Sequence, residues 1–258
     1  DAVRSRGLGD VYKRQAQPYI FSVSYCYGIE AINNLGNPAA LIGHSLGEYT
    51  ALCLSGYLDY KDALKVIAVR GEEMHKAVEN SNTTMAAVLT GDLETTIEEI
   101  EKLNNQGIQI WISNFNDPSQ IVISSYIDDM NYLKSNPKAL GAKRVIPLEV
   151  AGAFHTEIVS SAKKPLEDTL NSIDISEGKI PVYMNVDAKK VEVSTLKESL
   201  VNQIDNSVLF NQQIEFVNND IDPDLWCHIG PGNVTAGMVR KSISYKDLKV
   251  INSLESSK

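Results

Sequence analysis

Ser45 has the residue type and the setting of a nucleophile that accepts an acyl group. It lies at the centre of Gly43-His44-Ser45-Leu46-Gly47, after the apolar run 39–42 and before the helix-forming stretch 48–54. A Gly-x-Ser-x-Gly sequence between a strand and a helix is typical of a sharp turn that exposes the serine hydroxyl. Side chains two residues to either side of the serine would collide in such a turn, so the sequence predicts glycine there for steric reasons.

The segments around Ser45 predict a core built from helices and short strands. A largely apolar helix is expected from Gln17, with Pro18 in its first turn, and a strand at 39–42 leads into the serine. Asp59 can cap a further helix that carries Arg70 and Met74. Beyond residue 150, the apolar runs predict more helices and strands that complete a parallel sheet.

The middle of the chain has a separate rhythm of strands and helices. Strands are expected at 85–89, 108–112, 121–123 and 145–148, with an amphipathic helix at 93–103 and another around 130–133. Asn114 and Asn116 are predicted to shape the turn before Pro118. The order β-α-β-β-α-β is the ferredoxin-like pattern, and it is complete enough to form an inserted subdomain.

These patterns predict an α/β fold with two parts. Residues 16–82 and 150–258 form the core domain with its parallel sheet, and residues 83–149 form the ferredoxin-like subdomain. Residues 1–15 differ from the rest, because they are basic in an acidic chain and show no apolar period. We interpret them as an artefact in place of the natural N-terminus, with a natural tail as the alternative.

Composition excludes several classes of function. The formal net charge of the 258 residues is −9, which argues against nucleic acid as the main partner. No apolar run approaches the length of a membrane span, and the four histidines show no metal-ligand spacing. The three cysteines, Cys26, Cys53 and Cys227, are widely separated, as free thiols in a reducing cytoplasm would be.

Five motifs in order carry a resemblance to a known family. They are Gln17-Pro18, Gly43-His44-Ser45-Leu46-Gly47-Glu48-Tyr49, Arg70-Gly71-Glu72-Glu73-Met74, Gly152-Ala153-Phe154-His155 and Gly230-Pro231-Gly232. The chain resembles the malonyl-CoA:acyl carrier protein transacylases of fatty acid synthesis. It is equally similar to the stand-alone acyltransferases that serve polyketide synthases. The resemblance covers roughly residues 17–251 and implies an α/β-hydrolase-like core with a ferredoxin-like insertion.

The resemblance implies a serine–histidine pair for acyl transfer. It makes Ser45 the nucleophile and His155 the base that takes its proton and returns it to the leaving thiol. The backbone carbonyl of Gln203 would hold the other nitrogen of the imidazole, in place of the usual carboxylate. The backbone N–H of Leu46 would stabilise the oxyanion.

The same resemblance implies the residues that bind the substrate. Arg70 would hold the free carboxylate of the malonyl group, and Phe154 would crowd an α-methyl group and so favour malonyl over methylmalonyl. Met74 would line the acyl slot. His44 and Gln17 would also lie at the substrate; for His44, a purely structural role in the turn is an equal alternative.

One family feature has no counterpart in the sequence. The family normally has an earlier strand and a Gly-Gln-Gly loop whose glutamine assists the oxyanion hole. Residues 1–15 contain nothing like it, and Gly7-Leu8-Gly9 is not a substitute. A missing oxyanion donor costs about 10²- to 10³-fold in rate, so low activity is one expectation for the chain as given.

The expected partners are malonyl-CoA and an acyl carrier protein, with no bound cofactor and no metal. The carrier supplies the phosphopantetheine thiol, and Lys163-Lys164, Lys189-Lys190 and Arg240-Lys241 are candidate docking patches for its acidic surface. The resemblance suggests a monomer and leaves open whether the carrier belongs to fatty acid or polyketide synthesis. Two alternative functions remain: an ester or thioester hydrolase, and a truncated, non-catalytic interaction domain.

Overall fold

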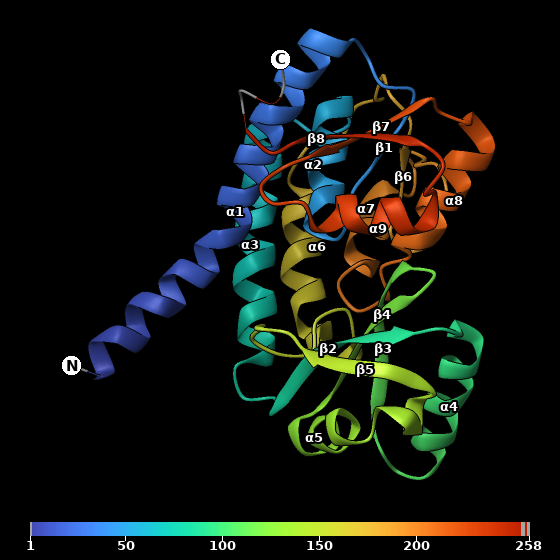
Figure 1. The fold of residues 1–258 in the computed structure, drawn as a ribbon. Helices are drawn as coiled ribbons and strands as arrows, with labels where there is room; N and C mark the ends of the chain where they lie inside the picture. The colour runs from blue at the N-terminus through green and yellow to red at the C-terminus, as the bar shows by residue number, and fades with distance from the viewer. Residues whose placement is uncertain (1, 254–255, 257–258) are drawn as a thin grey trace.

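The computed structural model describes residues 2–253 and 256, with side chains from residue 16 onward. The chain folds into a core and a smaller part that lies below it in Figure 1. The core contains both ends of the described chain, and the smaller part is made from the middle of the sequence. No helix in residues 2–253 is both long and apolar enough to cross a membrane.

One side of the core is a layer of helices around a single apolar cluster. Its main helices are α1 (Ala2–Leu35), α2 (Leu46–Ser55), α3 (Tyr60–Val78), α6 (Lys163–Asn171) and α7 (Leu196–Asn202), with the short 3₁₀ helix η2 (Glu157–Ala162) before α6. The side chains of Phe21, Leu52, Ile67, Leu166 and Leu200 are fully buried in this cluster. Burial of such side chains is the main source of stability here.

Two helix starts show how well local signals predicted the boundaries. The carboxylate of Asp59 accepts a hydrogen bond from Lys61 N, so the predicted cap of α3 is confirmed. For α1 the predicted start is wrong, because the helix begins at Ala2 and Pro18 lies inside it. A proline inside a helix removes one backbone hydrogen bond, which made a start at Gln17 the simpler expectation.

The strands of the core form two separate parallel pairs. Strand β1 (Leu41–Ile42) pairs with β6 (Val182–Tyr183), and β7 (Leu225–Ile229) pairs with β8 (Asp247–Ile251). Helices α8 (Phe210–Ile221) and α9 (Val234–Ser242) pack beside them on a second apolar cluster. The single parallel sheet predicted for the core is therefore not formed by residues 2–253.

A cavity of about 780 Å³ lies between the two pairs. Residues of β1 and β7 both line it, together with residues of α1, α2 and α8. The pairing of β1 with β6 and of β7 with β8 uses one edge of each strand. Within the described residues, no strand bridges the other two edges.

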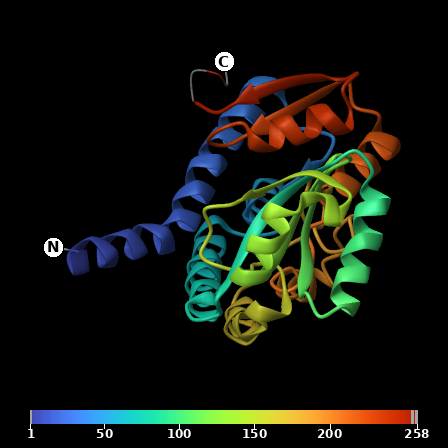
Figure 2. The same cartoon turned by 60° about the horizontal axis from the view of Figure 1, so that its bottom comes forward.

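The smaller part contains one antiparallel sheet of four strands, in the order β3-β4-β2-β5. The strands are β2 (Thr83–Thr90), β3 (Ile110–Asp117), β4 (Gln120–Tyr126) and β5 (Ala142–Pro147). Helix α4 (Leu93–Asn105) joins β2 to β3, and α5 (Ile127–Ser135) with the 3₁₀ helix η1 (Pro137–Leu140) joins β4 to β5. The predicted element order β-α-β-β-α-β is thus observed. Helices α4 and α5 cover the sheet face that is turned away from the core (Figures 1 and 2).

The predicted turn through Asn114 and Asn116 is wrong, because β3 continues to Asp117. The ladder between β3 and β4 shifts register between Ile112 and Asn114 and again between Phe115 and Asp117. These irregularities re-aim side chains along the strand. Phe115 packs on the cluster beneath the helices, whereas its neighbours Asn114 and Asn116 are buried on the other side, toward the core.

Candidate functional site

The turn at Ser45 has the strained geometry expected of an exposed nucleophile. Ser45 has φ 52° and ψ −105°, and α2 begins at the next residue. A Cβ added at Gly43 would lie 2.1 Å from the backbone of Gly47, so only glycine fits at position 43. The matching steric expectation for Gly47 is wrong, because a Cβ there would meet no atom within 4 Å.

The structure brings Ser45 and His155 together, although they are 110 residues apart. Ser45 Oγ lies 2.8 Å from His155 Nε2, and His155 Nδ1 lies 2.8 Å from the carbonyl oxygen of Gln203. Because a carbonyl can only accept, Nδ1 carries the proton and Nε2 is free to accept the proton of the serine. This is the tautomer that a general base requires.

Arg70 donates from Nη2 to Ser45 Oγ at 2.9 Å. Since the serine oxygen already accepts from this guanidinium, its own proton is directed to His155. Burial lowers the pKa of His155 to about 3, and the positive charge of Arg70 adds to this shift. The imidazole is therefore neutral near pH 7 and able to act as a base.

Arg70 is only 2% exposed, and hydrogen bonds hold both terminal nitrogens of its guanidinium. Nη1 donates to Gln17 Oε1 at 2.6 Å, and Nη2 also donates to Gln203 Oε1 at 2.9 Å. The ring of Tyr49 lies beneath it, 5.5 Å from the guanidinium carbon. No described carboxylate pairs directly with Arg70 in a salt bridge. A buried cation in this position favours an anion that arrives with a substrate.

A fully buried polar cluster of Glu48, Asn185 and Gln203 lies beneath the turn. Asn185 Oδ1 accepts from the N–H of Ser45, and Asn185 Nδ2 donates to the carbonyl of Gly43. Glu48 accepts from the backbone N–H of Asn185 and from the side-chain amide of Gln203. Burial raises the pKa of Glu48 to about 8, although these hydrogen bonds and Arg70 act in the opposite direction.

His44 and Asn116 connect the turn to the smaller part of the molecule. His44 Nε2 lies 2.9 Å from Asn116 Oδ1, and the amide of Asn116 donates to Gln120 Oε1. The ring of His44 also contacts Phe210 edge-on and lines the large cavity. Burial lowers the pKa of His44, so the ring is neutral and donates to Asn116.

The other predicted residues lie close to this constellation or in the core behind it. The N–H of Gly47 donates to the carbonyl of His44, and the N–H of Glu48 donates to the carbonyl of Ser45. The N–H of Leu46, at the first position of α2, has no acceptor within the helix. Met74 is buried in the main apolar cluster, one turn beyond Arg70, and Phe154 packs against the same cluster. Their roles as walls of the acyl slot remain predictions.

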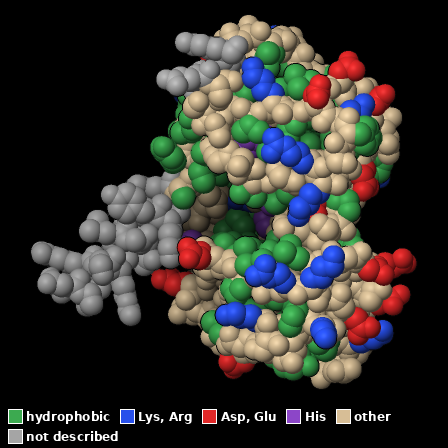
Figure 3. All heavy atoms as spheres, viewed as in Figure 1, with side chains coloured by type: hydrophobic (Ala, Val, Ile, Leu, Met, Phe, Trp, Pro, Cys, Tyr) green, Lys and Arg blue, Asp and Glu red, His purple; other side chains and the backbone are tan. Residues whose placement is uncertain are grey.

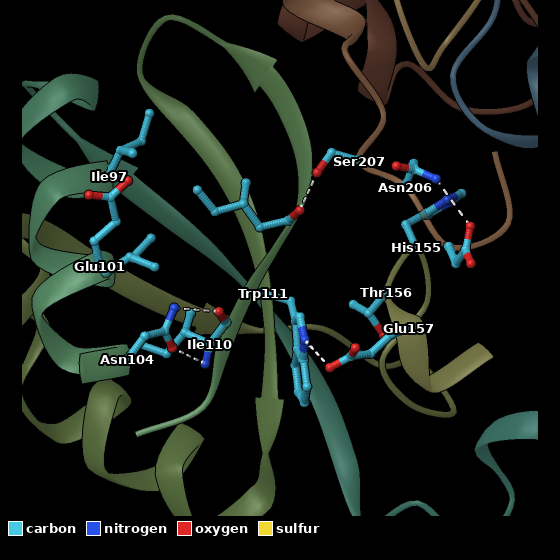
Figure 4. Close-up of a pocket in the computed structure, with 13 residues that line it drawn as sticks. Ile97, Glu101, Asn104, Ile110, Trp111, His155, Thr156, Glu157, Asn206 and Ser207 are labelled. Carbon is cyan, nitrogen blue, oxygen red and sulfur yellow. Dashed lines mark hydrogen bonds between the residues drawn. The ribbon is translucent and has the colours of Figure 1, made fainter. Parts of the chain in front are cut away.

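Two pockets include residues of the site, the large cavity beside Ser45 and a smaller pocket beside His155. The large cavity is lined by Gln17, His44, Ser45 and Arg70, and a hollow between the two parts of the molecule is visible in Figure 3, with histidine in its wall. A second pocket of about 430 Å³ lies between α4, β3 and the segment after His155. In Figure 4, Trp111 Nε1 donates to Glu157 Oε1 across this second pocket, and His155 lies at its edge.

The comparisons with known proteins agree with this geometry. Residues 14–255 match the sequence model of the acyl transferase domain. The chain belongs to the acyl transferase domain family. The malonyl CoA-acyl carrier protein transacylase of Bacillus subtilis (strain 168) is 36% identical to this acyltransferase over 228 residues, which is 88% of this chain and 71% of the relative.

Solved structures give the same result for the fold of this acyltransferase. A Streptococcus pneumoniae structure superposes with a TM-score of 0.88 at 31% identity, covering 96% of this chain and 81% of that one. A malonyl-transacylase solved with a type II polyketide synthase acyl-carrier protein superposes with a TM-score of 0.87 at 29% identity, covering 95% and 79%. The α/β fold predicted for this chain is therefore confirmed at the level of the whole molecule.

Sequence reasoning missed several residues that hold this acyltransferase site in place. Asn116 was assigned to a turn, and no role was predicted for Glu48, Asn185 or the side chain of Gln203. Glu48 had the one available signal, since a charged residue at the start of an apolar helix calls for a partner. The partners themselves are 137 and 155 residues away, which no local period reveals.

We expect the rate of Ser45 acylation to be nearly independent of pH between 5 and 7. The lowered pKa of His155 keeps the imidazole neutral throughout this range, so no fraction of the base is lost to protonation. The check is kcat/KM for an acyl-CoA substrate at each pH, with a change of less than about threefold expected. A tenfold fall per pH unit below about 6.5 would instead show an imidazole that titrates at its ordinary value.

The same shift has a consequence for folding. Unfolded His155 binds a proton near pH 6.5, whereas the folded form does not bind one until about pH 3. Stability present above pH 6.5 is therefore lost progressively as the pH falls from 6.5 toward 3. Assays at the acid end need a parallel thermal melt to separate unfolding from the chemistry.

Proposed function

We propose that this chain transfers a malonyl group from malonyl-CoA to the phosphopantetheine thiol of an acyl carrier protein, by a ping-pong route. The observation that carries the proposal is the position of Ser45 Oγ, within 2.9 Å of both His155 and the buried guanidinium of Arg70. A nucleophile beside a buried cation suits an acyl group that has its own carboxylate. The curated relatives at 34–36% identity are named malonyl CoA-acyl carrier protein transacylases.

In the first half-reaction Ser45 Oγ attacks the thioester carbonyl while His155 Nε2 takes the hydroxyl proton. The oxyanion of the tetrahedral intermediate would face the N–H of Leu46 at the positive end of α2. Collapse of the intermediate breaks the C–S bond, and the imidazolium returns its proton to the departing thiolate of coenzyme A. The thiol of the carrier then attacks the malonyl–Ser45 ester by the same steps in reverse.

Arg70 would select the substrate by binding the malonyl carboxylate. In the free protein its nitrogens hold neutral oxygens of Gln17, Ser45 and Gln203, so a carboxylate would gain a charge-assisted pair. Two parallel hydrogen bonds from the guanidinium would fix the far end of the acyl group and place the thioester over Ser45. We assign Phe154 the discrimination against an α-methyl group, which is a preference of about 1–3 kcal/mol.

Among the three candidate docking patches, Arg240-Lys241 is the best placed for an acidic carrier protein. Lys241 pairs with Asp117, next to Asn116, which holds His44. Figure 3 shows lysine and arginine side chains above and below the hollow between the two parts. Lys164 and Lys190 also pair with carboxylates, those of Asp168 and Asp220, so the choice among the patches depends on the nearness of Lys241 to the residues around His44. A structural neighbour was solved in complex with an acyl-carrier protein.

We also infer the type of fold of each domain and a cytoplasmic location. The strand order β3-β4-β2-β5 and its two helices support a ferredoxin-like subdomain at residues 83–149. The strand–serine–helix turn supports an α/β-hydrolase-like core at 16–82 and 150–258. The free thiols of Cys26 and Cys227 are exposed, which suits a reducing cytoplasm.

Intact mass spectrometry after brief mixing with malonyl-CoA tests the proposal. We expect a malonyl-sized adduct on the protein that disappears when a holo carrier protein is added, while the carrier gains the same mass. Rapid loss of the adduct to water without transfer would establish the hydrolase instead. A folded protein that forms no adduct would contradict acyl transfer by this chain.

A further inference from the structure

Glu48 is a buried acidic residue that the transfer mechanism does not use. Its side chain is fully buried in the first turn of α2, three residues after Ser45. Oε1 accepts from the backbone N–H of Asn185, and Oε2 accepts from Gln203 Nε2 at 2.6 Å. Burial of a carboxyl group is costly, so its place directly beneath the nucleophile calls for a physical reason.

The side-chain amide of Gln203 lies between Glu48 and Arg70. Its nitrogen donates to Glu48 Oε2 and to the carbonyl of Ser45, and its oxygen accepts from Arg70 Nη2 at 2.9 Å. An amide has a donor end and an acceptor end. If it turned over, two donors would face each other at Arg70, and the amide oxygen would face Glu48 Oε2, which accepts a hydrogen bond in this structure. The carboxyl of Glu48 therefore determines which end of the amide meets the guanidinium.

We propose that Glu48 is a positioning residue that orients the Gln203 amide and thereby fixes Arg70 where it binds the substrate carboxylate. The proposal rests on malonyl transfer, because only an acyl group with a carboxylate needs Arg70 in that place. Gln17 accepts a hydrogen bond from Nη1 of the same guanidinium. The side-chain amides of Gln17 and Gln203 therefore fix the positions of its two terminal nitrogens. Glu48 thus acts on substrate selection from beneath the site, without touching the substrate.

The substitution Glu48→Gln tests this role with almost no change of shape. Its new NH₂ group must face either the N–H of Asn185 or the amide nitrogen of Gln203, so one buried donor loses its acceptor. We expect acylation of Ser45 by malonyl-CoA to fall about 10- to 100-fold. Acetylation by p-nitrophenyl acetate, a neutral ester with no carboxylate, should change less than about threefold.

A double substitution separates positioning of Arg70 from damage to the fold. In an Arg70→Ala background, Glu48→Gln should lower malonyl acylation less than about twofold, because the group that it positions has gone. An equal loss in both backgrounds, or an equal loss with both substrates, would overturn the proposal. Glu79→Gln, which removes an exposed charge at the end of α3, is the matched control and should react like the parent.

A second variant keeps the test decisive if Glu48→Gln does not fold. Gln203→Met removes the amide but retains the backbone carbonyl that holds His155, and it should lower malonyl acylation about 10- to 100-fold. Malonyl acylation that is retained in full in this variant would refute the role of the amide. A parent protein that reacts with the neutral ester but never with malonyl-CoA would refute malonyl transfer itself, and the proposal with it.

Discussion

Ser45→Ala is expected to reduce acylation by malonyl-CoA at least about 10⁴-fold, to the background reaction. The substitution removes the one oxygen that lies within hydrogen-bond distance of both His155 and Arg70. The thermal melt should stay close to that of the parent, because alanine keeps the same backbone geometry at this turn. Quenched reactions read by intact mass measure the loss directly.

The control for Ser45→Ala addresses the exposed thiols. Cys26 and Cys227 are free and exposed, and a thiol can also accept an acyl group from a thioester. A protein with both cysteines changed to serine should keep the full malonyl adduct. Should Ser45→Ala keep the adduct and the cysteine variant lose it, the acyl group would be on a thiol, and the proposed mechanism would be wrong.

Arg70→Ala is expected to lower malonyl acylation about 10²- to 10³-fold and to leave reaction with a neutral ester much less affected. The pair between a buried guanidinium and a carboxylate accounts for roughly 3–5 kcal/mol when one partner is removed. Each 1.4 kcal/mol corresponds to a factor of ten. The ratio of malonyl to neutral-ester rates should therefore fall by a similar factor, which makes this variant a test of specificity.

Arg70→Lys is the companion variant, because Arg70 is buried and its truncation to alanine leaves a space in the core. Lysine keeps the charge but cannot form two parallel hydrogen bonds, so an intermediate rate is expected. Equal losses toward malonyl-CoA and the neutral ester in both variants, with a lower melting temperature, would mean that Arg70 supports the fold and does not select the substrate.

Local signals in the sequence predicted those parts of the fold that depend on neighbouring residues. Asp59 at the start of α3 and the strand–Ser45–helix order both follow from caps, apolar periods and glycine. The pairing of Ser45 with His155 and Gln203 was predicted from motifs that resemble a family, and the structure brings these three groups together. Neither composition nor periodicity alone would have joined residues so distant in the chain.

Contacts between distant segments account for what the sequence did not predict. Asn116 was assigned to a turn because Pro118 follows it, yet irregular pairing with β4 extends β3 and points Asn116 at His44. The apolar runs of the core strands predicted one parallel sheet. The structure instead has two parallel pairs with a cavity between them. Glu48 gave no hint of its partners, which come from two other elements.

The backbone conformation of Ser45 and His155 lowers the stability of the fold, although both side chains are needed for the proposed reaction. Ser45 has φ 52° and His155 has φ 59°, a region that residues other than glycine occupy at a cost of order 1–3 kcal/mol. Glycine would relieve that cost at either position and would remove the reacting side chain. A selection for heat resistance alone would thus favour loss of function at these two positions. Efforts to stabilise this protein should hold both residues fixed and look to its surface.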